Sequence, residues 1–133
     1  MTAHASGKFE VTTETQSEHK SEGASLARMS LSKQFHGGLE GSSTGEMLSA
    51  ISGVEGSAGY VAITRFSGAL DGRIGTFVFQ HSGTMTRGTR RQNVTVVPDS
   101  GTGQLAGLAG TLRVKIKDGK HFYDFEYTIE QTH

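Results

Sequence analysis

Hydrophobic and polar residues alternate along most of the chain, and no window carries the apolar stripe of a helix. The clearest alternation lies in residues 59–67 (GYVAITRFS) and 75–82 (GTFVFQHS). A period of two is typical of strands that bury one face. The same criterion predicts further strands at residues 8–13, 26–35, 39–51, 90–97, 111–117 and 120–129. The pattern therefore predicts an all-β fold.

Turn signals separate the predicted strands. Asp71-Gly72 and Asp118-Gly119 supply left-handed backbone geometry and predict tight hairpins. Residues 16–23 (QSEHKSEG) are polar and charged, so we expect a loop there. Pro98 ends a strand because proline cannot donate to the ladder. Glycine-rich residues 98–110 (PDSGTGQLAGLAG) predict a longer connection with one helical turn.

The short connections decide the expected architecture. They favour antiparallel neighbours, because parallel pairs need long crossovers. An open meander would leave two bare edges, and closure removes them. We therefore expect a closed antiparallel barrel of about eight strands in a single domain over residues 1–133. A two-sheet sandwich is the alternative.

Composition narrows the classes of function. The chain has no cysteine, which excludes disulfides, thiolate zinc sites and cysteine nucleophiles. Lysine plus arginine equals aspartate plus glutamate at 13 each, so there is no basic excess for nucleic acid. No apolar run is long enough to span a membrane, and residues 1–8 lack a signal-peptide pattern. We therefore expect a cytoplasmic protein with neither nucleic-acid nor membrane partners.

Gln80 and His81 are adjacent on a predicted strand, so they point to opposite faces. His81 shares its face with Phe77 and Phe79. One of the two polar side chains must then point into a barrel. There an imidazole can shuttle a proton and an amide can orient a carbonyl. A structural hydrogen bond to the backbone is the alternative for either residue.

Glu46 and Arg65 are the other charged candidates. A buried Glu46 could act as a general acid or base, whereas an exposed strand charge is the alternative. Arg65 can pair with Glu46, with a ligand carboxylate or on the surface. We predict Glu46 and His81 as catalytic residues, and Gln80, Arg65 and Tyr60 as ligand-binding residues.

Two further patterns complete the site analysis. Tyr123, Phe125 and Tyr127 share one face of the last predicted strand, which indicates a core or a subunit contact, with a ligand wall as the alternative. The six histidines show no metal-ligand spacing. We therefore predict neither a metal nor a cofactor.

Several segments resemble a bacterial family called domain of unknown function 3224, nearly end to end. The segments are residues 7–15 (GKFEVTTET), 33–50 (KQFHGGLEGSSTGEMLSA), 56–84 (ending FVFQHSGT), 96–107 (VVPDSGTGQLAG) and 121–129 (HFYDFEYTI). The resemblance implies a fold like the allene oxide cyclase barrel. Some relatives of that fold cyclise or isomerise small molecules, and others guide coupling without reacting. The chain departs from the family pattern at Thr13 and Val94, where tryptophans are common, and at Thr64, where glutamate is common.

Two classes of function remain. In the first, the barrel binds a small apolar or carbonyl-containing molecule and isomerises or cyclises it without a cofactor. In the second, the barrel is packed solid and serves as a non-catalytic oligomeric scaffold. Residues 60–66 are apolar on both faces, which suits burial in a homo-oligomer. A lumen with mixed polar and apolar walls favours the first class, and a filled lumen favours the second.

Overall fold

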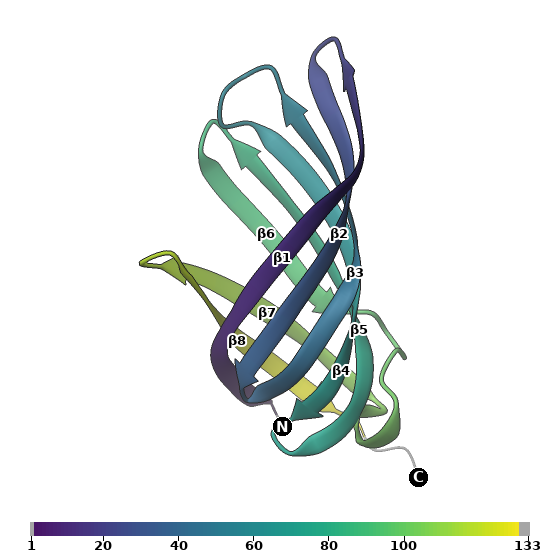
Figure 1. The fold of residues 1–133 in the computed structure, drawn as a ribbon. Helices are drawn as coiled ribbons and strands as arrows, with labels where there is room; N and C mark the ends of the chain where they lie inside the picture. The colour runs from purple at the N-terminus through teal and green to yellow at the C-terminus, as the bar shows by residue number, and fades with distance from the viewer. Residues whose placement is uncertain (1, 131–133) are drawn as a thin grey trace.

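Eight strands and one short 3-10 helix make up the computed structural model, which describes residues 2–130. The strands are β1 (Ala3–Ser21), β2 (Ala24–Gly37), β3 (Leu39–Ser52), β4 (Ala58–Leu70), β5 (Arg73–Thr86), β6 (Thr89–Val96), β7 (Leu108–Lys117) and β8 (Lys120–Ile129), with the helix η1 (Gly103–Leu105) between β6 and β7 (Figure 1). Each strand pairs antiparallel with the next, and β8 pairs with β1. The predicted closed barrel is confirmed, and the sandwich alternative is wrong.

The hairpin turns follow the predicted chemistry. Asp71 and Gly72 both have positive φ angles, 48° and 86°, and join β4 to β5. This geometry is cheap for aspartate and glycine and matches the twist of the flanking strands. Asp118 and Gly119 repeat it between β7 and β8. The longer connection after Pro98 contains η1, as the sequence indicates.

The predicted loop at residues 16–23 is wrong except at Glu22 and Gly23, which form a turn. Strand β1 continues to Ser21 and pairs with β2 as far as Ala24. A register shift between Thr15 and Ser17 marks a bulge in the ladder. The β1 half of this hairpin is exposed on both faces, so residues 16–21 show no apolar alternation.

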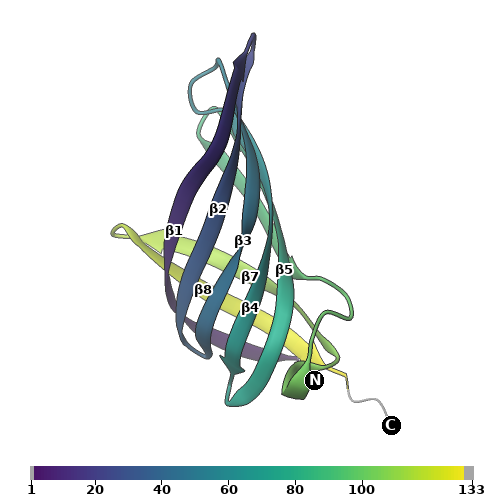
Figure 2. The ribbon, with the colours of Figure 1, turned by 45° about the vertical axis from the view of Figure 1, so that its right-hand side comes forward.

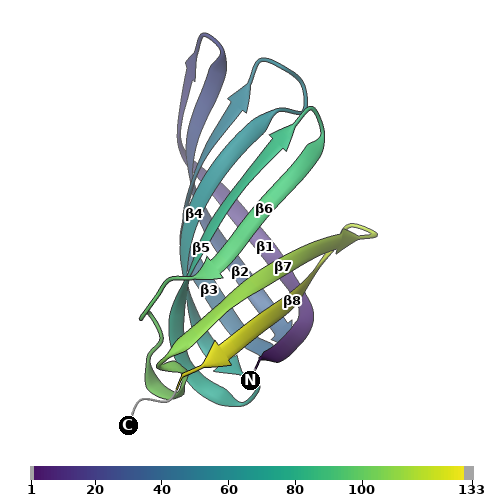
Figure 3. The same cartoon turned by 180° about the vertical axis from the view of Figure 1, so that it is seen from behind.

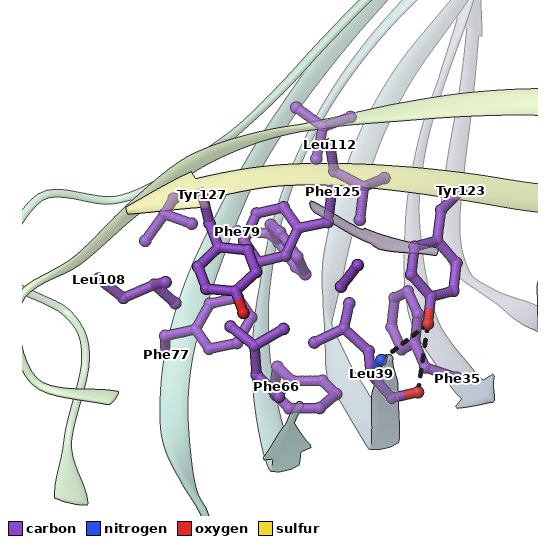
Figure 4. Packing of buried hydrophobic residues seen from close by; sticks show 14 of the residues in the cluster. Phe35, Leu39, Phe66, Phe77, Phe79, Leu108, Leu112, Tyr123, Phe125 and Tyr127 are labelled. Atoms are coloured by element: carbon purple, nitrogen blue, oxygen red, sulfur yellow. Dashed lines mark hydrogen bonds between the residues drawn. The ribbon is translucent and has the colours of Figure 1, made fainter. Parts of the chain in front are cut away.

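Inward-facing side chains fill the end of the barrel where β1 begins and β8 ends (Figure 4). Phe77 and Phe125 are fully buried, with ring centroids 6.0 Å apart and nearly parallel planes. Phe79 meets both rings edge-on. Such offset and edge contacts add to the free energy of burial. The aromatic stripe on β8 is therefore a core element, one of the predicted alternatives.

Two tyrosine hydroxyls tie the packed end together. The Tyr123 hydroxyl accepts from the Leu39 backbone N–H at 2.8 Å (Figure 4) and donates to the His36 carbonyl at 2.9 Å. The Tyr127 hydroxyl donates to Asp71 at 2.5 Å. Burial and this carboxylate raise the pKa of Tyr127 to about 12, so it remains a donor. These bonds connect β8 to the two turns that close this end.

The barrel opens along the seam between β6 and β7. These strands pair only at Val94 with Leu112 and at Thr95 with Thr111. Beyond those pairs they diverge, and the β7–β8 hairpin points away from the long extensions of β1 to β6 (Figures 2 and 3). The seam leaves one side of the interior accessible.

No helix within residues 2–130 is long and apolar enough to cross a membrane.

Candidate functional site

A cavity of about 220 Å³ lies inside the barrel, beside the aromatic core. All eight strands contribute to its wall. The lining residues are Phe9, Val11, Thr13, Leu31, Lys33, Met47, Tyr60, His81, Arg90, Gln92, Val114, Ile116 and His121. Phe9 belongs both to this wall and to the core, where its ring lies 5.2 Å from that of His121. The lumen is thus packed at one end and hollow further along.

The seam between β6 and β7 gives access to this cavity. A surface cleft follows the seam, and it shares four lining residues with the cavity: Arg90, Gln92, Val114 and Ile116. The cleft lies where the two strands no longer pair. The cleft and the cavity therefore share part of one wall at the seam.

Tyr60 and His81 form a hydrogen-bonded pair in the cavity wall. The Tyr60 hydroxyl lies 2.6 Å from Nε2 of His81, and the rings meet edge-on. Gly83 makes room for this arrangement, because a Cβ there would lie only 2.6 Å from the Tyr60 ring. The pair is held by two neighbouring strands, β4 and β5.

The surroundings fix the charge states of this pair. Burial, and then the positive charge of Lys33, lower the pKa of His81 to about 4. Burial raises the pKa of Tyr60, although Arg90 opposes the shift. At neutral pH the imidazole is therefore neutral and the phenol protonated. Nδ1 of His81 is shielded from solvent and has no hydrogen-bond partner within residues 2–130. Whichever tautomer forms, the pair leaves one polar atom unsatisfied.

Lys33 is the most unusual group in the cavity. Its Nζ lies 5.3 Å from the centroid of the Phe9 ring. No ion pair or hydrogen bond from the ammonium to another residue of the described chain is formed. The ring favours the charged amine, but desolvation is stronger and lowers the pKa of Lys33 to about 8. An appreciable fraction of the amine is therefore neutral near physiological pH.

The polar wall of the cavity is rich in donors and lacks acids. Arg90 is a second cation, and Gln92 adds an amide on the same strand. Within the described lining there is neither aspartate nor glutamate. The same residues 2–130 contain no cluster of three histidine or acidic side chains that could hold a metal ion. The site is thus electropositive and suited to an oxygen-bearing ligand.

Two of the five predicted site residues lie in this cavity, namely Tyr60 and His81. The expected lumen positions of the other three are wrong. Gln80 alternates with the inward-facing Phe79 and His81, so it points outward. Arg65 alternates with the buried Thr64 and Phe66 and reaches Thr76 at 3.3 Å.

Glu46 is also an outer residue. The odd-numbered positions of β3, such as Leu39 and Ser43, face the interior, and Glu46 lies on the opposite face. Its carboxylate pairs with Arg28 at 2.5 Å, and both side chains are about half exposed. The predicted acid–base role of Glu46 inside the lumen is therefore wrong.

Sequence reasoning missed Lys33 and Arg90. A signal existed for Lys33, because it lies two residues from both Leu31 and Phe35 on the apolar face of its strand. Arg90 similarly shares a face with Val94. A charge on the buried face of an amphipathic strand is unusual and marks a functional candidate.

The outer face of β3, β4 and β5 carries an exposed apolar patch, formed by Leu48, Val61, Ile63 and Val78. Leu48, Val61 and Ile63 are each more than half exposed. The Arg28–Glu46 ion pair and Gln80 border the patch. Apolar patches of this kind commonly mark protein interfaces.

Comparison with known proteins identifies the family. The model of the family described as "Protein of unknown function (DUF3224)" matches residues 5–127. The crystal structure of a DUF3224-family protein of unknown function from Shewanella oneidensis MR-1 is 46% identical, with a TM-score of 0.92. That match covers 98% of this chain and 100% of the other. No curated protein matches the chain. The chain therefore belongs to the DUF3224 family, as its sequence motifs indicate.

Proposed function

We propose that the barrel binds a small organic molecule with an apolar body and a carbonyl or carboxylate oxygen. One observation carries this proposal. The cavity presents Lys33, Arg90 and the Tyr60–His81 pair without any carboxylate among its described lining residues. A bound oxygen would accept hydrogen bonds from the two cations, Lys33 and Arg90, which form no ion pair within residues 2–130.

The apolar part of the wall defines the rest of the ligand. Val11, Leu31, Met47, Val114 and Ile116 surround the polar groups. A cavity of about 220 Å³ accepts a molecule of roughly ten non-hydrogen atoms, since one water takes about 30 Å³ in the liquid and covalently bonded atoms pack more closely. We therefore favour a short aliphatic or single-ring compound.

The Tyr60–His81 pair supports an isomerase or cyclase activity that needs no cofactor. A neutral imidazole can accept a proton, and a hydrogen-bonded phenol can donate one to a carbonyl oxygen. Together they could interconvert a keto and an enol form of a bound ligand. The family resemblance implies a fold like the allene oxide cyclase barrel, and some relatives of that fold catalyse the same class of reaction. In this proposal His81 is the base and Tyr60 the acid.

Hexanoate is a suitable probe of the binding proposal. We expect it to bind, with chemical-shift changes confined to cavity residues in an NMR titration. Arg90→Gln should weaken binding about tenfold, the effect of losing one charge-assisted hydrogen bond. Arg91→Gln is the matched control, because Arg91 is adjacent on β6 and lies outside the cavity lining. Equal losses in both variants, or shifts elsewhere on the barrel, would contradict the proposed site.

A second function is favoured by the apolar outer patch. We propose that two copies of the chain associate through Leu48, Val61, Ile63 and Val78 to form a homo-oligomer. The patch lies on a sheet face bordered by both signs of charge, from Arg28, Arg65 and Glu46, so a second copy can meet it with unlike charges opposed. The zero formal net charge of the chain adds no general repulsion between copies.

The oligomer proposal is tested by sedimentation. We expect the wild-type chain to sediment as an oligomer at micromolar concentration and Val61→Lys to sediment as a monomer. Ile74→Lys should leave the mass unchanged, because Ile74 is also exposed but lies outside the patch. A monomeric wild type, or dissociation by Ile74→Lys alone, would exclude this interface.

A further inference from the structure

Lys33 is placed to react with a ligand as well as to bind it. We propose that its Nζ forms a reversible imine with aldehydes or ketones that enter through the β6–β7 seam. This inference rests on the proposed binding function and names the ligand class more closely. The chain would then act as a carrier or catalyst for small carbonyl compounds.

The geometry isolates this amine from the partners that usually occupy lysine. Nζ lies over the Phe9 ring inside the cavity, and no carboxylate of the described chain is within ion-pair distance of it. Lys20, on the exposed extension of β1, instead pairs with Glu18 at 3.9 Å. A desolvated amine without an acidic neighbour is the usual setting of Schiff-base lysines.

The charge state of Lys33 supports the reaction. An ordinary lysine amine is protonated at neutral pH and has no lone pair to attack with. Desolvation lowers the pKa of Lys33 to about 8, which makes the nucleophilic form accessible. The low pKa of His81 has the Lys33 charge as its second cause, so the two groups lie close enough to influence each other.

The proposed step balances without any oxidant or reductant. The Nζ lone pair attacks the carbonyl carbon, and the carbonyl oxygen takes a proton to give a carbinolamine. Loss of that hydroxyl forms the C=N bond, and both protons of the amine leave in the water released. Dehydration needs an acid at the departing oxygen and a base for the second proton. Tyr60 and the neutral His81 line the same cavity and can fill these two roles.

Reductive trapping tests the proposal directly. The intact protein is incubated with hexanal and sodium cyanoborohydride at pH 7, and the labelled residue is mapped by peptide mass spectrometry. We expect one label per chain at low hexanal concentration, located on Lys33. Hexanoate should slow the labelling by competition, because both probes occupy the same cavity.

Two variants and the binding of hexanoate distinguish the possible outcomes of this experiment. Lys33→Arg should lower the initial rate of labelling by at least about tenfold, whereas Lys115→Arg, at an exposed position of β7, should not. Circular dichroism confirms that each variant is folded, and mapping of the wild type is independent of any variant. Labels spread over the exposed lysines would overturn the imine proposal. If hexanoate still bound under those conditions, the binding function would stand without the imine; if neither probe bound, both would fail.

Discussion

Phe125→Ala is expected to destabilise the barrel by about 3–5 kcal/mol, the usual loss for a large buried aromatic residue. Phe125 is fully buried on β8 and contacts the rings of Phe77, Phe79 and Tyr127. Removing the ring loses its transfer free energy and leaves a void that neighbouring strands cannot collapse to fill, because their ladders fix the spacing. Domains of this size have about 5–15 kcal/mol in total, so the variant should lie close to unfolding. Urea unfolding monitored by circular dichroism measures the loss.

Phe122→Ala provides the matched control on the same strand. Phe122 points outward and is 36% exposed, so its removal opens no cavity in the core. We expect a change of about 1 kcal/mol or less. Similar losses in the two variants would mean that the aromatic cluster is not what holds the barrel closed.

Much of the fold can be predicted from the sequence because strands and hairpins are determined by residues close together in the chain. Asp71-Gly72 and Asp118-Gly119 fix two hairpins by backbone geometry alone. Alternation on β8 separates Tyr123, Phe125 and Tyr127 from the outer residues, and short connections force antiparallel neighbours. The extension of β1 to Ser21 could not be predicted this way, because both of its faces are exposed and leave no hydrophobic pattern.

The site was less predictable, because the inward face of each strand is set by pairing across the whole barrel. Alternation along a strand places Gln80 and His81 on opposite faces, but it does not decide which of the two points into the barrel. Residue type makes Glu46 a candidate acid or base, but its strand buries the alternate positions and Arg28 pairs with it on the outer face. Lys33 and Arg90 meet in one cavity only after strands distant in sequence have closed around them.

The partly filled lumen reconciles the two classes of function. Aromatic rings in the packed half of the barrel stabilise the fold, so the other half does not need a packed core. Polar groups that would weaken a solid core can then line a hollow at limited cost. The limited β6–β7 pairing matches these two halves, because the barrel is closed at the packed end and open along the seam beside the cavity.

Lys33→Met is expected to stabilise the protein by about 1–2 kcal/mol at pH 7 while abolishing imine formation, because it removes an unpaired, desolvated charge. The sign follows from linkage. The pKa of Lys33 falls from 10.5 to about 8 on folding, so between these values the unfolded chain binds more protons and wild-type stability rises with pH. The advantage of the variant should therefore be full below pH 8 and disappear as pH approaches 10.5. Thermal unfolding across this range measures it.

Lys8→Met distinguishes this effect from a general benefit of methionine. Lys8 is exposed on β1, next to the buried Phe9, and its replacement should change stability by less than about 0.5 kcal/mol at any pH. In Lys33→Met the pKa of His81 should also rise, because one of the two causes that lower it is gone. A destabilised Lys33→Met would mean that the ammonium is well solvated or paired, and the chemical role assigned to this amine would fail with it. A stabilised variant that no longer traps hexanal would show that the barrel carries Lys33 at a cost in folding free energy, for a function outside folding.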